Sequence, residues 1–163
     1  MEVNATRESG RLEELMIIFL AAKYSRREEL CKYKEELQAK GHKVQASWLD
    51  GKNQKGPDGF PLGEEGELLI EKENQDKTLT PRAIALRQKM AHDGFRDVLM
   101  CDLFIGFTET PRINSRGGRY VEMGIALGRM RMVWIVGPRE NLFCWHEDIK
   151  QFDTWEQCLA MFK

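Results

Sequence analysis

Short apolar runs constrain the fold of this chain more than any other feature of its sequence. Leu103 to Phe107, bounded by Asp102 and a Thr-Glu-Thr-Pro turn, is too short to be a helix. Such a run is typical of a strand buried on both faces of a parallel sheet. Met16 to Ala22 and Met132 to Val136 have the same character. The sequence therefore predicts a largely parallel sheet flanked by helices.

The segments between these runs support this class. After Met16 to Ala22, a helix is expected from Ser25, its predicted N-cap, to Gly41, followed by a strand from Lys43 to Trp48. A second long helix should begin at Thr80-Pro81. A chain of 163 residues with 42% apolar residues fills one core. We expect a single α/β three-layer domain over residues 15–163, flavodoxin- or Rossmann-like, with a mostly parallel sheet of four to five strands.

Composition narrows the classes of partner. With 25 basic and 26 acidic residues, no net field draws the chain to a nucleic acid polymer or an anionic membrane, so a small-molecule substrate is expected. The first apolar run is too short to span a membrane and follows acidic residues, which favours a cytoplasmic protein. The four cysteines are widely spaced, so they are predicted to be reduced: Cys31, Cys101, Cys144 and Cys158. The three histidines, His42, His92 and His146, do not cluster either, so neither a metal nor a cofactor is predicted.

A candidate site lies after the strand at Leu103 to Phe107. Ligands of open α/β sheets bind outside the carboxyl ends of the strands, where the loop from Thr108 to Glu122 emerges. Gly117 and Gly118 permit close approach of the backbone to a ligand. Near the start of the following helix, the carboxylate of Glu122 is expected to be held ionised. The alternative is that Glu122 is only an acidic residue of the kind favoured in the first turns of a helix.

The run Gly-Gly-Arg-Tyr-Val-Glu-Met-Gly-Ile-Ala, residues 117–126, preceded by Phe107-Thr108-Glu109, resembles the signature of the nucleoside 2-deoxyribosyltransferase family. That family includes related hydrolases that cleave the N-glycosidic bond of nucleoside 5′-monophosphates. The resemblance implies that Glu122 attacks the anomeric carbon of the sugar and that Gly117, Gly118 and Arg119 lie at the substrate. It also implies a homodimer or larger homo-oligomer.

Two acids upstream are further candidates. Asp93 and Asp97 are four residues apart and share one face of a continuous helix. Members of the resembling family place an Asp in this region in contact with the base or sugar. Both Asp93 and Asp97 remain candidates for that role, with Asp97 alternatively a structural cap.

The turn after the first strand also faces the predicted crevice. The resemblance implies that Tyr24, Ser25 and Arg26 line the sugar site and, in the nucleotide-cleaving branch, hold the 5′-phosphate. The alternative is that Ser25 only caps the helix and Arg26 is solvated. Asn141 follows the strand at Met132 to Val136 and, by resemblance, reaches the sugar of a neighbouring subunit. An ordinary turn residue is the alternative for Asn141.

Two segments are expected to lie outside the regular layers. Residues 1–14 begin with a polar stretch that shows no helical or strand periodicity, and they are predicted to be a mobile arm. Residues 50–79 are rich in glycine and charge, and are predicted to be a long loop that serves as a lid or an interface.

The sequence thus favours cleavage or transfer of an N-glycosidic bond through a covalent glycosyl intermediate on Glu122. A non-catalytic nucleotide-binding module on the same fold is one alternative, and an enzyme that releases nicotinamide from NAD is another. A Rossmann dehydrogenase is excluded, because residues 21–27 contain no glycine for a dinucleotide-binding turn.

Overall fold

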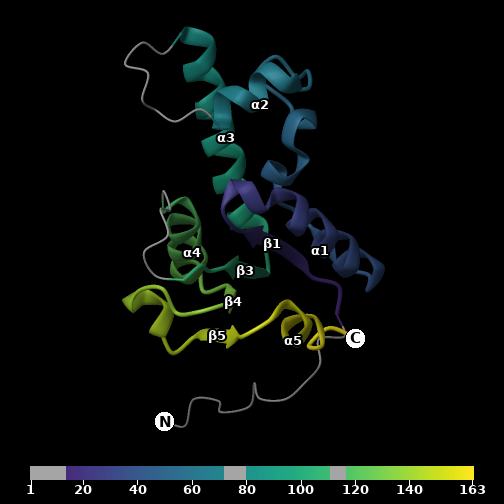
Figure 1. Cartoon of the computed structure of the whole chain (residues 1–163), viewed down its shortest axis with the longest axis vertical. Coiled ribbons are helices and arrows are strands. Elements are labelled where there is room, and N and C mark those ends of the chain that lie inside the picture. Colours follow the sequence, from purple (N-terminus) through teal and green to yellow (C-terminus); the bar gives the residue numbers. More distant parts are fainter. Residues whose placement is uncertain (1–13, 72–79, 111–116) are drawn as a thin grey trace.

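The protein forms one parallel sheet of five strands. A computed structural model describes residues 14–71, 80–110 and 117–163 (Figure 1). The strand order β2-β1-β3-β4-β5 places β3 in the middle, and all four pairings are parallel. The strands are β1 Ile17–Ala21, β2 Lys43–Val44, β3 Leu103–Phe107, β4 Met132–Val136 and β5 Ile149–Phe152.

Helices cover both faces of the sheet, which makes three layers. On one face α3 packs against α4, and on the other α1 lies beside α5, where the rings of Tyr33 and Trp155 stack at 4.4 Å (Figure 1). The α-helices are α1 Arg27–Ala39, α2 Gly63–Glu71, α3 Pro81–Met100, α4 Gly118–Gly128 and α5 Trp155–Leu159. The 3₁₀ helices are η1 Tyr24–Arg26, η2 Ser47–Asn53 and η3 Leu142–Trp145. The predicted three-layer α/β class is confirmed.

The core explains why the apolar runs become strands. Every residue of β3 is buried, and four of the five residues of both β1 and β4 are buried. A central parallel strand is covered by helices on both sides, so it has no polar face. The edge strand β5, which no sequence pattern located, buries only Ile149 and Phe152.

The second predicted strand is shorter than expected. Only Lys43 and Val44 pair with β1, and the chain enters η2 at Ser47. The backbone N–H of Ser47 donates to Asp97 of α3 at 2.7 Å, which turns the chain away from the sheet. A long-range contact that the local sequence does not reveal therefore ends this strand.

The prediction of a long structureless loop over residues 50–79 is wrong for most of that range. The chain forms η2, an antiparallel bridge between Lys55 and Pro61, and helix α2. These elements lie beside the first half of α3, above the sheet (Figure 1). Three of the glycines there, Gly51, Gly59 and Gly63, have a positive φ, which residues with a Cβ rarely adopt. Residues 72–79 are outside the described residues, and a lid or interface role stays a prediction.

Helix α3 begins as predicted and has no break at Gly94. The side chain of Thr80 accepts a hydrogen bond from the backbone N–H of Ala83, and Pro81 occupies the first turn. Asp93 and Asp97 therefore share one buried face of a continuous helix. The predicted N-terminal arm falls almost wholly outside the described residues. Among the helices that are described, none has the length and apolar character to cross a membrane.

Candidate active site

The order of the strands locates the crevice where a ligand can bind. Strand β1 pairs with β2 on one side and β3 on the other, so the chain direction across the sheet reverses between β1 and β3. Open α/β sheets bind ligands at such a reversal, outside the carboxyl ends of the strands. The segments beginning at Ala22 and Thr108 leave the sheet at this point. The residues that follow these two strands are η1 on one side and Thr108 and Glu109 on the other.

Glycine opens helix α4 as predicted. Gly117 is the N-cap with φ of 76°, a left-handed conformation that residues with a Cβ rarely adopt, and Gly118 starts the helix. Glu122 is the fifth helical residue, so it lies beyond the first turn, which contains no acid. The alternative explanation, that Glu122 is only an acidic residue favoured in the first turn of a helix, therefore does not apply.

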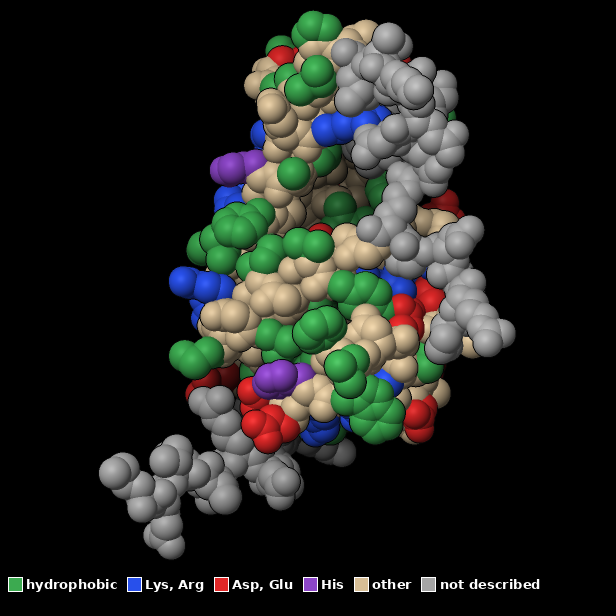
Figure 2. Space-filling view, turned by 90° about the vertical axis from the view of Figure 1, so that its left-hand side faces the viewer, with side chains coloured by type: hydrophobic (Ala, Val, Ile, Leu, Met, Phe, Trp, Pro, Cys, Tyr) green, Lys and Arg blue, Asp and Glu red, His purple; other side chains and the backbone are tan. Residues whose placement is uncertain are grey.

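The carboxylate of Glu122 lies against helix α3. A Cβ placed on Gly94 would be 3.8 Å from Oε1 of Glu122, so the missing side chain of Gly94 leaves room for the carboxylate. Glu122 is half-buried, and none of the described residues donates a hydrogen bond to it. Figure 2 shows a hollow between the α4 region and the helices above it.

Burial raises the pKa of Glu122 to about 7, and the negative charge of Asp97 adds to the increase. Burial therefore shifts the pKa in the direction opposite to the expected effect of the helix start, and the ionised state of Glu122 stays a prediction. The stabilising field of a helix start acts mainly within the first turn, whereas Glu122 lies in the next turn and is withdrawn from water. A carboxyl group with a pKa near neutrality exchanges protons readily at physiological pH, which is typical of catalytic acids.

Asp97 holds the segment after β2 in place. It is fully buried, and its Oδ2 accepts hydrogen bonds from both the backbone N–H and the hydroxyl of Ser47. Its Oδ1 accepts a hydrogen bond from Nε2 of Gln45 at 3.2 Å, with a guanidinium nitrogen of Arg96 at 3.4 Å. Both oxygens of Asp97 are thus engaged within the protein.

Asp93, one turn earlier in α3, has one carboxylate oxygen that accepts no hydrogen bond from the described residues. Lys89 donates a short hydrogen bond to Oδ2 of Asp93, while Oδ1 is buried and has no hydrogen-bond donor among the described residues. The nearest cation to Oδ1 is a nitrogen of Arg96 at 3.6 Å. Of the two candidate acids, Asp93 is the one with a carboxylate oxygen to which no described residue donates a hydrogen bond.

Ser25 is not the N-cap of α1. It is exposed within η1, and Arg26, which occupies the cap position, makes no capping hydrogen bond through its side chain. A turn of 3₁₀ helix shifts the N-cap of α1 by one residue, from the predicted Ser25 to Arg26. The hydroxyl of Tyr24 donates to Glu67 of α2 at 3.1 Å, so α2 packs over the turn after β1.

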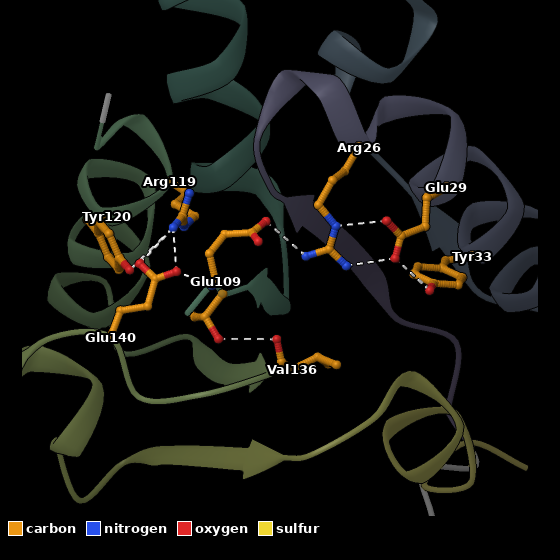
Figure 3. A network of polar contacts seen from close by, with 9 residues as sticks. Arg26, Glu29, Tyr33, Glu109, Arg119, Tyr120, Val136 and Glu140 are labelled. Atoms are coloured by element: carbon orange, nitrogen blue, oxygen red, sulfur yellow. Dashed lines mark hydrogen bonds and ion pairs between the residues drawn. The ribbon is translucent and has the colours of Figure 1, made fainter. Parts of the chain in front are cut away.

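A network of charges crosses the carboxyl ends of the strands (Figure 3). Arg26 is not solvated: its guanidinium donates to both oxygens of Glu29 at 2.7 and 2.6 Å and to Glu109 at 3.3 Å. At the other side, Nη2 of buried Arg119 donates to both oxygens of Glu140 at 2.6 and 2.7 Å. The backbone N–H of Glu109 donates to Glu140, which joins the two pairs.

Sequence reasoning assigned no role to Glu29, Glu109 or Glu140. Glu109 is the second residue after β3 and belongs to the Phe107-Thr108-Glu109 element quoted above, and these were the available signals. The sequence does not show that Glu109 faces Arg26, because the two residues are 83 positions apart.

Asn141 caps a turn in this structure. Its side-chain oxygen accepts hydrogen bonds from the backbone N–H groups of Phe143 and Cys144 at 2.9 and 3.3 Å. The ordinary turn role is thus present, and a contact with the sugar of a neighbouring subunit stays a prediction. Leu142, Phe143 and Trp145 of η3 are largely exposed, as expected if this surface meets a second subunit.

The described residues hold no cluster of three or more acids, cysteines and histidines that could hold a metal ion. The four cysteines are free thiols.

Comparison with known proteins identifies shared folds. No family model matches the sequence, and no curated protein matches it. A 2-deoxyribosyltransferase of Bacillus psychrosaccharolyticus has a similar structure, with a TM-score of 0.56, 14% identity, and coverage of 88% of this chain and 90% of that one. The CMP N-glycosidase BcmB of Clostridium botulinum has a TM-score of 0.50 and 14% identity, with coverage of 88% and 95%. At this identity the likeness shows the fold.

Proposed function

We propose that this protein cleaves the N-glycosidic bond of nucleosides or nucleoside 5′-monophosphates, as a 2-deoxyribosyltransferase or an N-glycoside hydrolase. Two enzymes of these kinds share its fold over most of its length. The sequence around Glu122 independently resembles the nucleoside 2-deoxyribosyltransferase family. Because a fold hosts many activities, the proposal depends on the site itself.

The observation that carries the proposal is the state of Glu122. Its carboxylate is half-buried, has no described hydrogen-bond donor, lies against a glycine of α3, and has a pKa of about 7. A purely structural carboxylate in such a place would be expected to have donors, because an unpaired buried charge is costly. Glu122 instead has no donor among the described residues, which leaves its carboxylate free to interact with a ligand.

In the proposed reaction, an oxygen of ionised Glu122 attacks C1′ of the sugar. The bond between C1′ and the base nitrogen breaks, its electron pair leaves with the base, and the base takes up a proton. A glycosyl ester of Glu122 results. Attack of water on C1′ then gives the free sugar, whereas attack of a second base gives a new nucleoside, and either step restores the carboxylate.

Asp93 is the better candidate to orient or protonate the departing base, since Asp97 is saturated by protein donors. Asp93→Asn is expected to lower kcat/KM for nucleosides by about 100-fold. With a nitrophenyl glycoside, whose leaving group needs no proton, the same variant should lose less than about tenfold. Equal losses on both substrates would show that Asp93 does not assist the leaving group.

The pH dependence tests the role of Glu122. A nucleophile must be ionised, so kcat/KM is expected to rise tenfold per pH unit below pH 7 and to level off above it, with an apparent pKa of about 7. If Glu122 instead donated a proton, activity would fall as the pH rises through 7. Initial rates between pH 5 and pH 9 distinguish the two roles.

The direct test is to incubate the protein with nucleosides and nucleoside 5′-monophosphates, with and without an added base, and to follow base release by chromatography. Mass spectrometry of the intact protein after rapid acid quench should show a glycosyl adduct that maps to Glu122. Binding of these ligands without release or exchange of base would favour the nucleotide-binding module instead. Release of nicotinamide from NAD alone would favour the glycohydrolase of that dinucleotide.

A further inference from the structure

Glu140 ties the start of helix α4 to the loop that follows β4. Its two oxygens accept hydrogen bonds from Nη2 of Arg119 at 2.6 and 2.7 Å (Figure 3). Arg119 is the second residue of α4, and its side chain is only 4% exposed, against 11% for that of Glu140. Hydrogen bonds between charged groups are strong, and pairs withdrawn from water are little screened. The pair therefore holds the first turn of α4 in place.

The same carboxylate also holds the segment after β3. The backbone N–H of Glu109 donates to Oε1 of Glu140 (Figure 3). Glu109 and Arg119 lie on either side of residues 111–116, which are outside the described residues. One side chain thus contacts both flanks of the connection between β3 and α4.

The loop that carries Glu140 is anchored to the edge strand β5. Gln151 of β5 donates through Nε2 to the carbonyl of Gly137 at 2.9 Å, and its Oε1 accepts from Nε of Arg139 at 2.9 Å. The backbone N–H of Gly137 also donates to the carbonyl of Phe152. The sheet therefore fixes the loop from which Glu140 reaches α4.

Glu122 lies one turn after Arg119 on the same helix. Residues three apart in an α-helix are neighbours on its surface, so a shift of the helix at Arg119 moves Glu122 as well. The carboxylate of Glu122 needs this placement to lie against α3, where a Cβ on Gly94 would be 3.8 Å from its Oε1. A chain of contacts thus runs from β5 through Glu140 and Arg119 to Glu122.

We propose that Glu140 is a positioning residue for Glu122, because it fixes the first turn of α4 through Arg119 and thereby holds the carboxylate of Glu122 against α3. This inference rests on the proposed function where it concerns catalysis, whereas the placement of Glu122 can be measured without a substrate. A misplacement of a reacting group by about 1 Å can cost about 100-fold in rate. Without Glu140, water reaches Glu122 and its oxygens leave the position for attack on C1′.

The placement is tested by measuring the pKa of Glu122. NMR titration of protein labelled with ¹³C in its glutamate carboxyl groups gives this pKa, and the signal is assigned by its absence in Glu122→Gln. Glu140→Gln is expected to lower the pKa from about 7 by about one pH unit or more, because the carboxylate becomes hydrated. Asp97 of α3, whose charge also raises the pKa of Glu122, is present in both proteins. Glu35→Gln, at an exposed position of α1, should leave the pKa unchanged.

Two further variants separate position from charge. Glu140→Gln removes a negative charge beside α4 and Arg119→Met removes a positive one, so a purely electrostatic effect would shift the pKa of Glu122 in opposite directions. Loss of position lowers the pKa in both variants. Glu140→Asp keeps the charge but shortens the side chain by one methylene, and it should lower the pKa as well. This variant provides the test if Glu140→Gln does not fold.

Kinetics test the consequence for catalysis. Base release by Glu140→Gln is expected to have a kcat lower by about 100-fold, with KM changed less than about threefold. An unchanged pKa of Glu122 in the Glu140 variants, opposite shifts in Glu140→Gln and Arg119→Met, or an unchanged kcat overturns the inference. A lower Tm without these changes would show a role in stability alone. A lower pKa in all three variants with no base release by the wild-type protein supports the placement by Glu140 and contradicts the proposed function.

Discussion

Glu122→Gln is expected to stop base release while the protein stays folded, with kcat/KM lower by about 10⁴-fold or more. Glutamine keeps the size of the side chain but cannot form the glycosyl ester, so the adduct should disappear from the intact mass spectrum. Residual turnover would come from positioning of the sugar alone. The rate of base release from a saturating nucleoside at pH 8 measures the effect.

The same variant is expected to be more stable than the wild-type protein at neutral pH. The pKa of Glu122 rises from 4.5 to about 7 on folding, so the folded state binds the proton more tightly. The wild-type protein therefore loses stability as the pH rises from about 4.5 to about 7, and Glu122→Gln lacks this loss. The advantage of the variant should be absent near pH 4.5 and reach up to about 3 kcal/mol at pH 8.

Urea unfolding at pH 4.5 and pH 8 measures this difference. Glu35→Gln is the matched control, because Glu35 is exposed on α1 and should change neither stability nor activity. A Glu122→Gln variant that is inactive but less stable at pH 8 would indicate a structural carboxylate. Wild-type activity in that variant would end the nucleophile proposal.

Asp97→Asn is expected to destabilise the protein by about 3–5 kcal/mol, or about 10 °C in Tm. The fully buried carboxylate accepts from the backbone and hydroxyl of Ser47 and from Gln45, and an asparagine has only one oxygen to offer them. Its NH₂ group would face donors, so the turn from β2 into η2 should loosen. Thermal unfolding measures the loss.

Asp97→Asn should also move the pH profile. The charge of Asp97 contributes to the high pKa of Glu122, so its removal lowers that pKa and shifts the acidic limb of kcat/KM to lower pH. Asp148→Asn is the control, since the Asp148 side chain is 75% exposed and lies outside the site. An unchanged Tm would show that the hydrogen bonds to Ser47 and Gln45 contribute little to stability.

Local patterns were sufficient for most elements of the fold. The runs that form β1, β3 and β4 are apolar on both faces, and Thr80-Pro81 carries its own start signal, so their identity did not depend on distant residues. Elements that need distant partners were missed or misjudged. Strand β5 is a short edge strand with only two buried side chains, and η2 depends on hydrogen bonds from Asp97.

In the candidate site, too, the local features could be predicted from the sequence, whereas contacts between distant residues could not. The sequence identified Glu122 and the glycines of α4, because a motif and a positive φ are local properties. It did not show that Arg26 is bound by Glu29 and Glu109, nor which of Asp93 and Asp97 has a free oxygen. These distinctions depend on which side chains meet across the sheet.

The sequence by itself determined the layered α/β class and the three principal strands, and it singled out Glu122 as the candidate acid. Only the tertiary structure raises the pKa of that acid to about 7, because the increase comes from its burial and from the charge of Asp97. It also decided that Arg26 meets Glu109, since adjacent parallel strands bring together residues that are far apart in sequence. Secondary structure follows from short-range patterns, whereas proton affinity and ion pairing depend on distances in space.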